Sequence, residues 1–66
     1  MTHVWVAQYV DFIGTWYFKD VYRSLDAAKK SISSNHEEFD VYVEKDGLVL
    51  IDVGTGRFVV RREKIK

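Results

Sequence analysis

The side chains able to do chemistry are few in this chain, and none of them forms a catalytic pattern. There is no cysteine, no glycine-rich loop before a helix that could hold a phosphate, and no serine in a nucleophile turn. The ten acidic residues have no arrangement that distinguishes them from the carboxylates of an ordinary soluble domain. We therefore expect a protein that is not an enzyme and needs no cofactor.

One short acidic stretch has the residue types of a metal site. It runs through residues 36–38, His-Glu-Glu, and continues to Asp40. The second histidine, His3, belongs to a distant strand, and no two ligands have the spacing of a known metal motif. A solvated loop is the better interpretation, so no metal site is predicted.

Basic residues gather at the C-terminal end of the sequence. The candidates for contact with nucleic acid are Arg57, Arg61, Arg62 and Lys64. Beside exposed aromatic rings, such a cluster is the minimal requirement for binding a single strand, because bases stack on rings while phosphates pair with cations.

Two observations weaken this alternative. The formal net charge of the chain is +0, so no overall positive field attracts phosphate. Three carboxylates, Asp40, Glu44 and Asp52, are expected on the same face as the basic cluster. Terminal lysines and arginines also serve to keep a sheet edge solvated. Nucleic acid is therefore the second choice of partner, after protein.

Length and composition indicate one domain covering residues 1–66. A chain this short buries only about 60% of its unfolded surface, so oligomerisation or a partner could supplement its thin core. The first ten residues lack the pattern of a secretory signal, and no stretch approaches the roughly 20 apolar residues that span a bilayer. We expect a cytoplasmic protein without a membrane segment.

The first half of the chain predicts two strands. The run from His3 to Val10 is rich in β-branched and aromatic residues and is apolar on both faces, which leaves open the row that faces a helix. A turn over residues 11–14 leads to a second strand over residues 15–22. Simple alternation puts Trp16, Phe18 and Tyr22 on one face of that strand, with Tyr17 and Lys19 on the other.

A helix is expected next. Ser24 is a suitable N-cap, and apolar residues recur at helical spacing at Leu25, Ala28 and Ile32. Asn35 could end the helix in a left-handed conformation.

Two linked hairpins follow. A three-residue loop over residues 45–47 would pair Val43 with Val49 and Val41 with Ile51, and we prefer it to a two-residue turn at Asp46 and Gly47, which would pair Val43 with Leu50. A two-residue turn at Gly54 and Thr55 would pair Ile51 with Phe58 and Val49 with Val60. The predicted fold is α+β, with the order ββαβββ and one helix on one face of an antiparallel sheet of about five strands, which could curl toward a barrel.

One helix about 10 Å across cannot cover five strands spaced about 4.8 Å apart. The face opposite the helix would then expose apolar side chains, and such a surface usually marks an interface. Two further apolar residues, Phe12 and Ile13, occupy the first turn, where polar residues are usual. They either fold back as a plug, which we expect, or insert into a partner. The candidate partner-binding residues are Phe12, Ile13, Tyr17, Tyr42, Leu48, Leu50 and Val59.

The segment from Val4 to Val43 resembles the layout of small bacteriophage-encoded proteins, including the T7-type inhibitor of bacterial RNA polymerase. The likeness consists of two strands, a helix entered through Tyr22, Ser24, Leu25 and Ala28, and a third strand. The additional hairpin and the balanced charge depart from that layout. The resemblance implies a class of compact proteins that block a host enzyme or a defence system, anti-CRISPR proteins included. We expect a phage-type inhibitor or accessory factor that binds a protein, and a homodimer is compatible with this.

Overall fold

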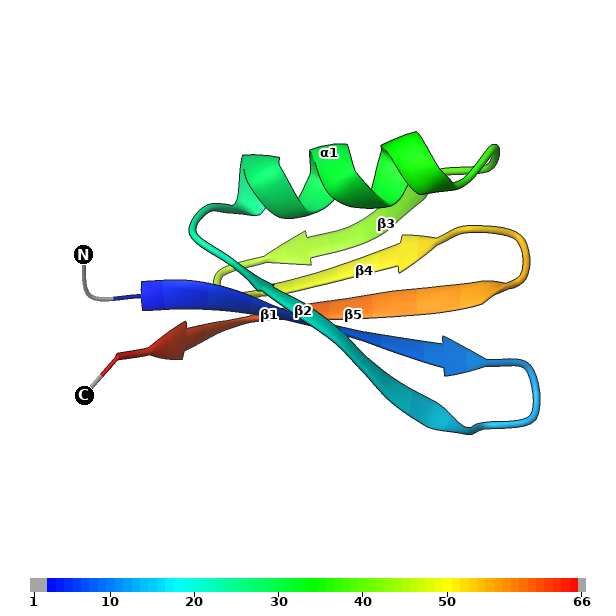
Figure 1. The fold of residues 1–66 in the computed structure, drawn as a ribbon, viewed down its shortest axis with the longest axis horizontal. Helices are drawn as coiled ribbons and strands as arrows, with labels where there is room; N and C mark the ends of the chain where they lie inside the picture. Colours follow the sequence, from blue (N-terminus) through cyan, green and yellow to red (C-terminus); the bar gives the residue numbers. More distant parts are fainter. Residues whose placement is uncertain (1–2, 66) are drawn as a thin grey trace.

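The computed structural model describes residues 3–65, which form one antiparallel sheet with a helix on one face (Figure 1). The elements in chain order are β1 (His3–Asp11), β2 (Trp16–Tyr22), α1 (Leu25–Asn35), β3 (Asp40–Lys45), β4 (Leu48–Asp52) and β5 (Gly56–Lys64). The strands lie in the order β2-β1-β5-β4-β3. The α+β prediction and its element order are confirmed, and the sheet is not closed into a barrel.

The row of β1 that faces the helix contains Trp5, Ala7 and Tyr9. Ala7 is fully buried, and Trp5 and Tyr9 pack against the same core. A small residue is needed where a helix crosses a sheet closely, and β1 offers one only in this row. Ala28 of α1 is likewise fully buried, so small residues from the helix and the sheet meet in one core. This decides the question that the sequence pattern leaves open.

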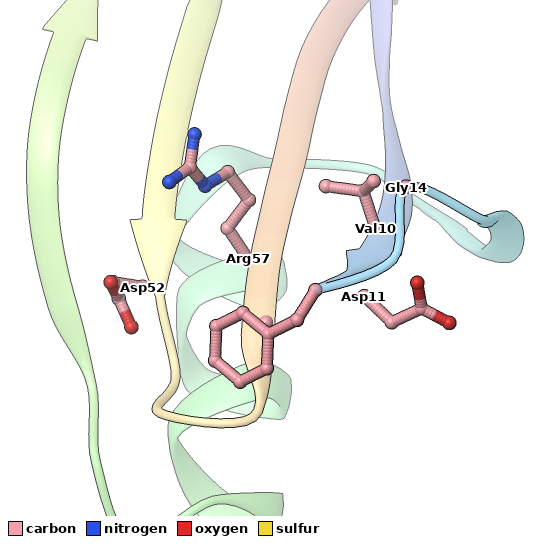
Figure 2. A pocket seen from close by; sticks show the side chains of 7 residues that line it. Val10, Asp11, Gly14, Asp52 and Arg57 are labelled. Atoms are coloured by element: carbon pink, nitrogen blue, oxygen red, sulfur yellow. The ribbon is translucent and has the colours of Figure 1, made fainter.

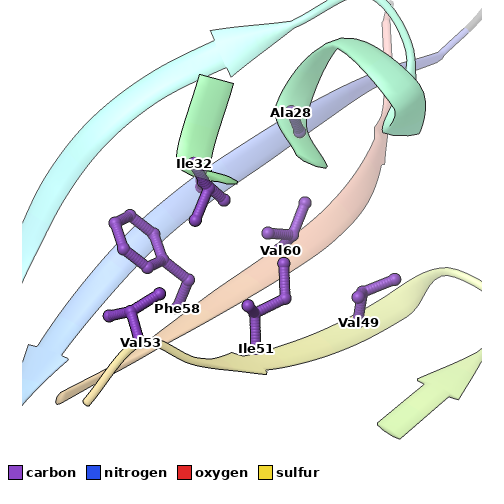
Figure 3. Close-up of a cluster of buried hydrophobic side chains, with 8 residues drawn as sticks. Ala28, Ile32, Val49, Ile51, Val53, Phe58 and Val60 are labelled. Atoms are coloured by element: carbon purple, nitrogen blue, oxygen red, sulfur yellow. The ribbon is translucent and has the colours of Figure 1, made fainter. Parts of the chain in front are cut away.

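The core lies between α1 and the three central strands (Figure 3). Its buried members are Ala7, Ala28, Ile32, Val49, Ile51, Val53, Phe58 and Val60. The alternating residues of β4 and β5 supply half of this set, because every second side chain of a strand points to the same face. All buried side-chain polar atoms of the described residues have a hydrogen-bond partner.

The helix begins as predicted and ends differently. The Ser24 hydroxyl accepts a hydrogen bond from the Ala27 amide at 3.1 Å, which satisfies one exposed donor of the first turn. No left-handed residue ends the helix, because His36 has an extended φ of −138°. The Asn35 amide instead donates to the Ser31 carbonyl at 2.8 Å. That side-chain bond satisfies a carbonyl of the last turn, and the prediction of a left-handed Asn35 was wrong.

The first C-terminal hairpin differs from the preferred prediction. Lys45 pairs with Leu48 and Val43 with Leu50, so the connection is the two-residue one, with Gly47 at a φ of +80°. A bulge between Val41 and Val43 then restores the predicted pairing of Val41 with Ile51. Because a bulge adds one residue to one strand, the pairing of the two-residue turn holds on one side of it and the predicted pairing of Val41 with Ile51 holds on the other.

The second hairpin agrees with the prediction. Ile51 pairs with Phe58 and Val49 with Val60, around a turn in which Gly54 has a φ of +84°. Positive φ at the first turn residue is what a type II′ turn requires.

Candidate protein-binding surface

The sheet face opposite α1 is here called the outer face. Cross-strand partners point to the same side of a sheet, so the strand registers define its members in three rows. The basic-end row is Val21, Val6, Arg61, Leu48 and Lys45; the middle row is Phe18, Gln8, Val59, Leu50 and Val43; the acidic-end row is Trp16, Val10, Arg57, Asp52 and Asp40. Since α1 lies on the other side of the sheet (Figure 1), it covers none of these side chains.

The exposed apolar area is largest at the β2 side of the outer face. Phe18 is 65% exposed and Trp16 is 52% exposed. At the centre of the middle row, Val59 is buried, although α1 lies on the other side of the sheet. Large, stiff aromatic side chains beside a packed apolar centre are typical of protein interfaces.

Most of the predicted partner-binding residues of the strands lie on this face. Leu48, Leu50 and Val59 belong to its rows. Tyr42 is half-exposed, and its ring lies 5.6 Å from the guanidinium carbon of Arg57. Since Arg57 belongs to the outer face, Tyr42 contributes to the same surface.

Tyr17 is not part of the outer face, and its predicted placement there was wrong. It pairs with Tyr9 on the helix side of the sheet, with the two ring centroids 6.2 Å apart. The reason is a bulge in β2, where Gln8 pairs with Phe18 but Ala7 pairs with Asp20, leaving Lys19 as the extra residue. A bulge reverses the face of every residue beyond it.

The same bulge brings Trp16, Phe18 and Val21 together on the outer face. Alternation alone separates Val21 from the two aromatic residues and so does not find this group. The available signal was the adjacent polar pair Lys19 and Asp20, which interrupts an otherwise aromatic strand.

The predicted nucleic-acid residues are divided between the two faces. Arg57 and Arg61 lie on the outer face. Arg62 lies on the helix side, where its guanidinium forms an ion pair with Asp46 at 3.0 Å. Lys64 stands two residues further along β5 and therefore points to the same side of the sheet. Only two of the four cations therefore share a surface with Trp16 and Phe18.

The turn between β1 and β2, here called the tip, exposes its two apolar residues. Phe12 is 79% exposed and Ile13 is 88% exposed, so the interpretation of these residues as a plug was wrong. The turn is shaped by the Asp11 carboxylate, which accepts hydrogen bonds from the amides of Ile13 at 3.1 Å and Thr15 at 3.0 Å. Because a side chain fixes the backbone, the turn can hold large apolar residues outward.

The tip also carries a perturbed tyrosine. The Tyr17 hydroxyl donates to the Asp11 carboxylate at 3.2 Å, and this hydrogen bond and the carboxylate charge raise the pKa of Tyr17 above its ordinary value. A raised pKa in the folded state means that the contribution to stability is complete below about pH 10 and is lost as pH rises through the folded pKa.

We expect Asp11→Asn to lower the pKa of Tyr17 toward that of a free tyrosine, because the negative charge is removed. Ultraviolet absorbance of the phenolate, followed against pH, measures this shift. The Tyr17→Phe variant identifies which of the titrating tyrosines is concerned. An unchanged titration of Tyr17 in Asp11→Asn would contradict the hydrogen bond.

A depression of about 240 Å³ lies between the tip and the acidic-end row (Figure 2). It is lined by Val10, Asp11, Phe12, Gly14, Asp52, Gly56 and Arg57. Figure 2 shows the Arg57 side chain from β5 and the Asp52 side chain from β4 at its border, where the two residues are cross-strand partners. The depression joins the tip to the outer face, so both can contact one partner.

The acidic stretch after the helix forms no metal cluster among residues 3–65. His36 Nδ1 lies 2.9 Å from the Ile32 carbonyl, and its ring packs edge-on against Phe58 with centroids 5.4 Å apart. The side chain of Glu38 lies against Gly54 at the second hairpin turn. Both contacts tie the loop to the end of the sheet.

Among the described residues, α1 is too short and too polar to cross a membrane. The chain finds no match among protein-family models, curated proteins or solved structures.

Proposed function

We propose that this chain is a small non-enzymatic protein-binding module whose contact surface is the outer face together with the tip. The observation that carries the proposal is the exposure of Trp16 and Phe18 on a sheet face that α1 does not cover. Removing large exposed apolar side chains from water is favourable, and the surface of a partner protein can cover them.

The composition of the outer face supports a protein partner. Its middle row is apolar except for Gln8, and charged residues stand in the two flanking rows. An apolar centre with a polar rim is the usual anatomy of a protein interface. The tip extends this surface with Phe12 and Ile13, which can enter a cavity on a partner.

The resemblance in layout to phage-encoded proteins supports a phage-type inhibitor or accessory factor in the cytoplasm as the form of this activity. Blocking by surface coverage needs no catalytic group on the inhibitor. A rigid sheet face with projecting aromatic residues is suited to that task, since little conformational entropy is lost when it binds.

Single-stranded nucleic acid is the second candidate, because Arg57 and Arg61 lie between the aromatic residues of β2 and Tyr42. Arg57 already contacts the Tyr42 ring, and its cross-strand neighbour is the carboxylate of Asp52. The adjoining Asp40 adds a second negative charge to the same row. Protein is therefore the better-supported partner.

The double variant Trp16→Ser/Phe18→Ser tests the proposal. Because both side chains are more than half exposed, we expect the fold to be retained, with a thermal midpoint within about 5 °C of the parent. We expect association with the partner, measured by light scattering and by capture from a bacterial lysate, to be lost.

The tip variant Phe12→Ser/Ile13→Ser should also weaken association, because the tip belongs to the proposed contact surface. Lys30→Ser/Glu37→Ser, at exposed positions outside that surface, is the matched control and should leave association unchanged. Unfolding of the Trp16→Ser/Phe18→Ser variant would contradict the proposal, since it would make the outer face part of the core. Salt-sensitive binding of a single-stranded oligonucleotide, lost in Arg57→Ser/Arg61→Ser, would favour the second candidate instead.

A further inference from the structure

We propose that the outer face is an interface between two copies of this chain, related by a twofold axis that runs across the strands. This inference rests on the part of the proposed function that assigns protein binding to the outer face, and it names a second copy as the occupant of that face in place of a host protein. It is carried by the apolar middle row, which faces itself when the strand direction is reversed, and by the opposite charges at the two ends of β3, which then face one another.

The two ends of the outer face carry opposite charges on the β3 and β4 side. Asp40 and Asp52 are cross-strand partners in the acidic-end row. Lys45 occupies the same strand as Asp40 but stands in the basic-end row, next to Leu48. The middle row separates the two ends with apolar residues. Like charges placed opposite one another, as in Asp40 and Asp52, are unfavourable in an isolated chain.

A twofold axis between two facing sheets, directed across the strands, reverses the strands of the second copy. The acidic-end row of one copy then faces the basic-end row of the other, and the middle row faces itself. Asp40 meets the second copy's Lys45, twice by symmetry. Val10 meets Val6 of the second copy, and Val59 meets its own counterpart at the centre. An isologous contact requires such a match of a surface with itself.

The arginines of β5 oppose this arrangement, because like charges face one another there, and carboxylates on their own chains offset part of the repulsion. Arg57 of one copy faces Arg61 of the other, and each has a carboxylate nearby on its own chain. Asp52 is the cross-strand partner of Arg57, and Glu63 follows Arg61 by two residues on the same face. An axis directed along β5 would instead set each arginine against itself. That axis also places β3 opposite β2 of the second copy, so Asp40 and Lys45 no longer face each other, and the axis across the strands is the better of the two.

The area of the outer face is sufficient for a stable dimer. The molecule measures 33 × 21 × 20 Å and exposes 4678 Å². A broad face of a body with these proportions is about a fifth of the total, or about 900 Å², where a standard interface buries about 800 Å² per partner. A second copy can therefore cover the face without any rearrangement.

The sheet edges are less suited to pairing than the face. The edge strand β2 carries a bulge at Lys19, and β3 carries one at Tyr42. Bulges and charged residues on edge strands oppose the addition of another strand. Two copies are therefore more suited to associate through their outer faces than by pairing their edge strands.

Charge reversal at the β3 ends tests the inference on the full chain. We expect a mass of two 7.8 kDa chains by light scattering and sedimentation. Asp40→Lys and Lys45→Asp should each weaken the dimer about tenfold or more, because each turns two attractive pairs into two repulsive ones. The double variant Asp40→Lys/Lys45→Asp should return to within about threefold of the parent. Asp40→Lys also relieves the repulsion from Asp52, so its weakening cannot be attributed to a less stable monomer.

Glu37→Lys and Lys30→Asp are the matched controls, because they change net charge equally at exposed positions outside the outer face. They should leave the dimer unchanged. A folded monomer at every concentration would overturn the inference while leaving the proposed function in place. A dimer insensitive to the single reversals, or not restored in the double variant, would also overturn it. Loss of the proposed function is recognised separately, by unfolding of Trp16→Ser/Phe18→Ser.

Discussion

Replacing Phe58 by alanine is expected to remove most of the stability of this domain. Phe58 is 4% exposed and lies in the core between the rings of Tyr9 and His36, with centroids 5.2 Å and 5.4 Å away. Truncating a buried phenylalanine costs about 3–5 kcal/mol. A domain of 66 residues has a free energy of unfolding of about 3–10 kcal/mol in total. The variant should therefore lose much of its free energy of unfolding, and it should be largely unfolded if the parent lies in the lower part of that range, as measured by circular dichroism in a urea titration.

Phe18→Ala is the matched control for this prediction. It removes the same atoms from the outer face, where the Phe18 side chain is 65% exposed. Its free energy of unfolding should fall by less than about 1 kcal/mol. Equal losses in the two variants would contradict the assignment of the faces, because they would mean that both phenylalanines are buried.

Replacing Gly56 by alanine is expected to have the second-largest effect. A Cβ atom at Gly56 would lie 2.5 Å from the Val10 carbonyl oxygen and 2.6 Å from the Tyr9 hydroxyl oxygen. The Val10 carbonyl is backbone of β1, the strand paired with β5, so relief requires the two central strands to separate. Such overpacking costs about 1–3 kcal/mol, which corresponds to a fall of roughly 5–20 °C in the thermal midpoint.

The cause of this effect can be separated from backbone strain. Gly56 does not have a positive φ, whereas Gly14 has a φ of +88° and no atom within 4 Å of an added Cβ. Gly14→Ala therefore introduces only conformational strain, of about 1 kcal/mol. A Gly56→Ala variant that is no less stable than Gly14→Ala would show that the strands are not so close. Loss of the hydrogen bond from the Tyr9 hydroxyl to Thr55, at 2.9 Å, should accompany the steric effect.

Alternation and capping were sufficient to predict the helix start at Ser24 and the shared face of Val49, Ile51, Phe58 and Val60. Both predictions follow from the regular spacing of side chains along a helix or a strand, and that spacing is uninterrupted in α1, β4 and β5. The helix-facing row of β1 could not be decided, since both rows are apolar. The need for a small residue under the helix, which Ala7 meets, is a property of packing between elements.

The candidate surface was predicted less completely than the core, and the bulges in β2 and β3 are the reason. A bulge adds one residue to one strand only, and its position depends on the partner strand. The polar pair Lys19 and Asp20 marks the region, but alternation does not identify Lys19 as the extra residue. Tyr17 was therefore placed on the wrong side, and Trp16 and Phe18 were not recognised as members of the same face as Leu50 and Val59. The exposure of Phe12 and Ile13 likewise depends on the Asp11 carboxylate holding the turn.

The pairing of β1 with β5 at the centre of the sheet has a consequence for synthesis. Among the five strands, β1 is synthesised before the others, but its partner at the centre of the sheet is β5. Val4 pairs with Glu63 and Ala7 with Val60. The hairpin of β1 and β2 can form early, but its buried row, with Trp5 and Tyr9, has only α1 to pack against until β5 arrives. Contacts between distant parts of a chain also form slowly. Until then the apolar residues of β1 lack the cover that β5 gives them, so we expect the partly synthesised chain to be more prone to aggregation than the finished domain.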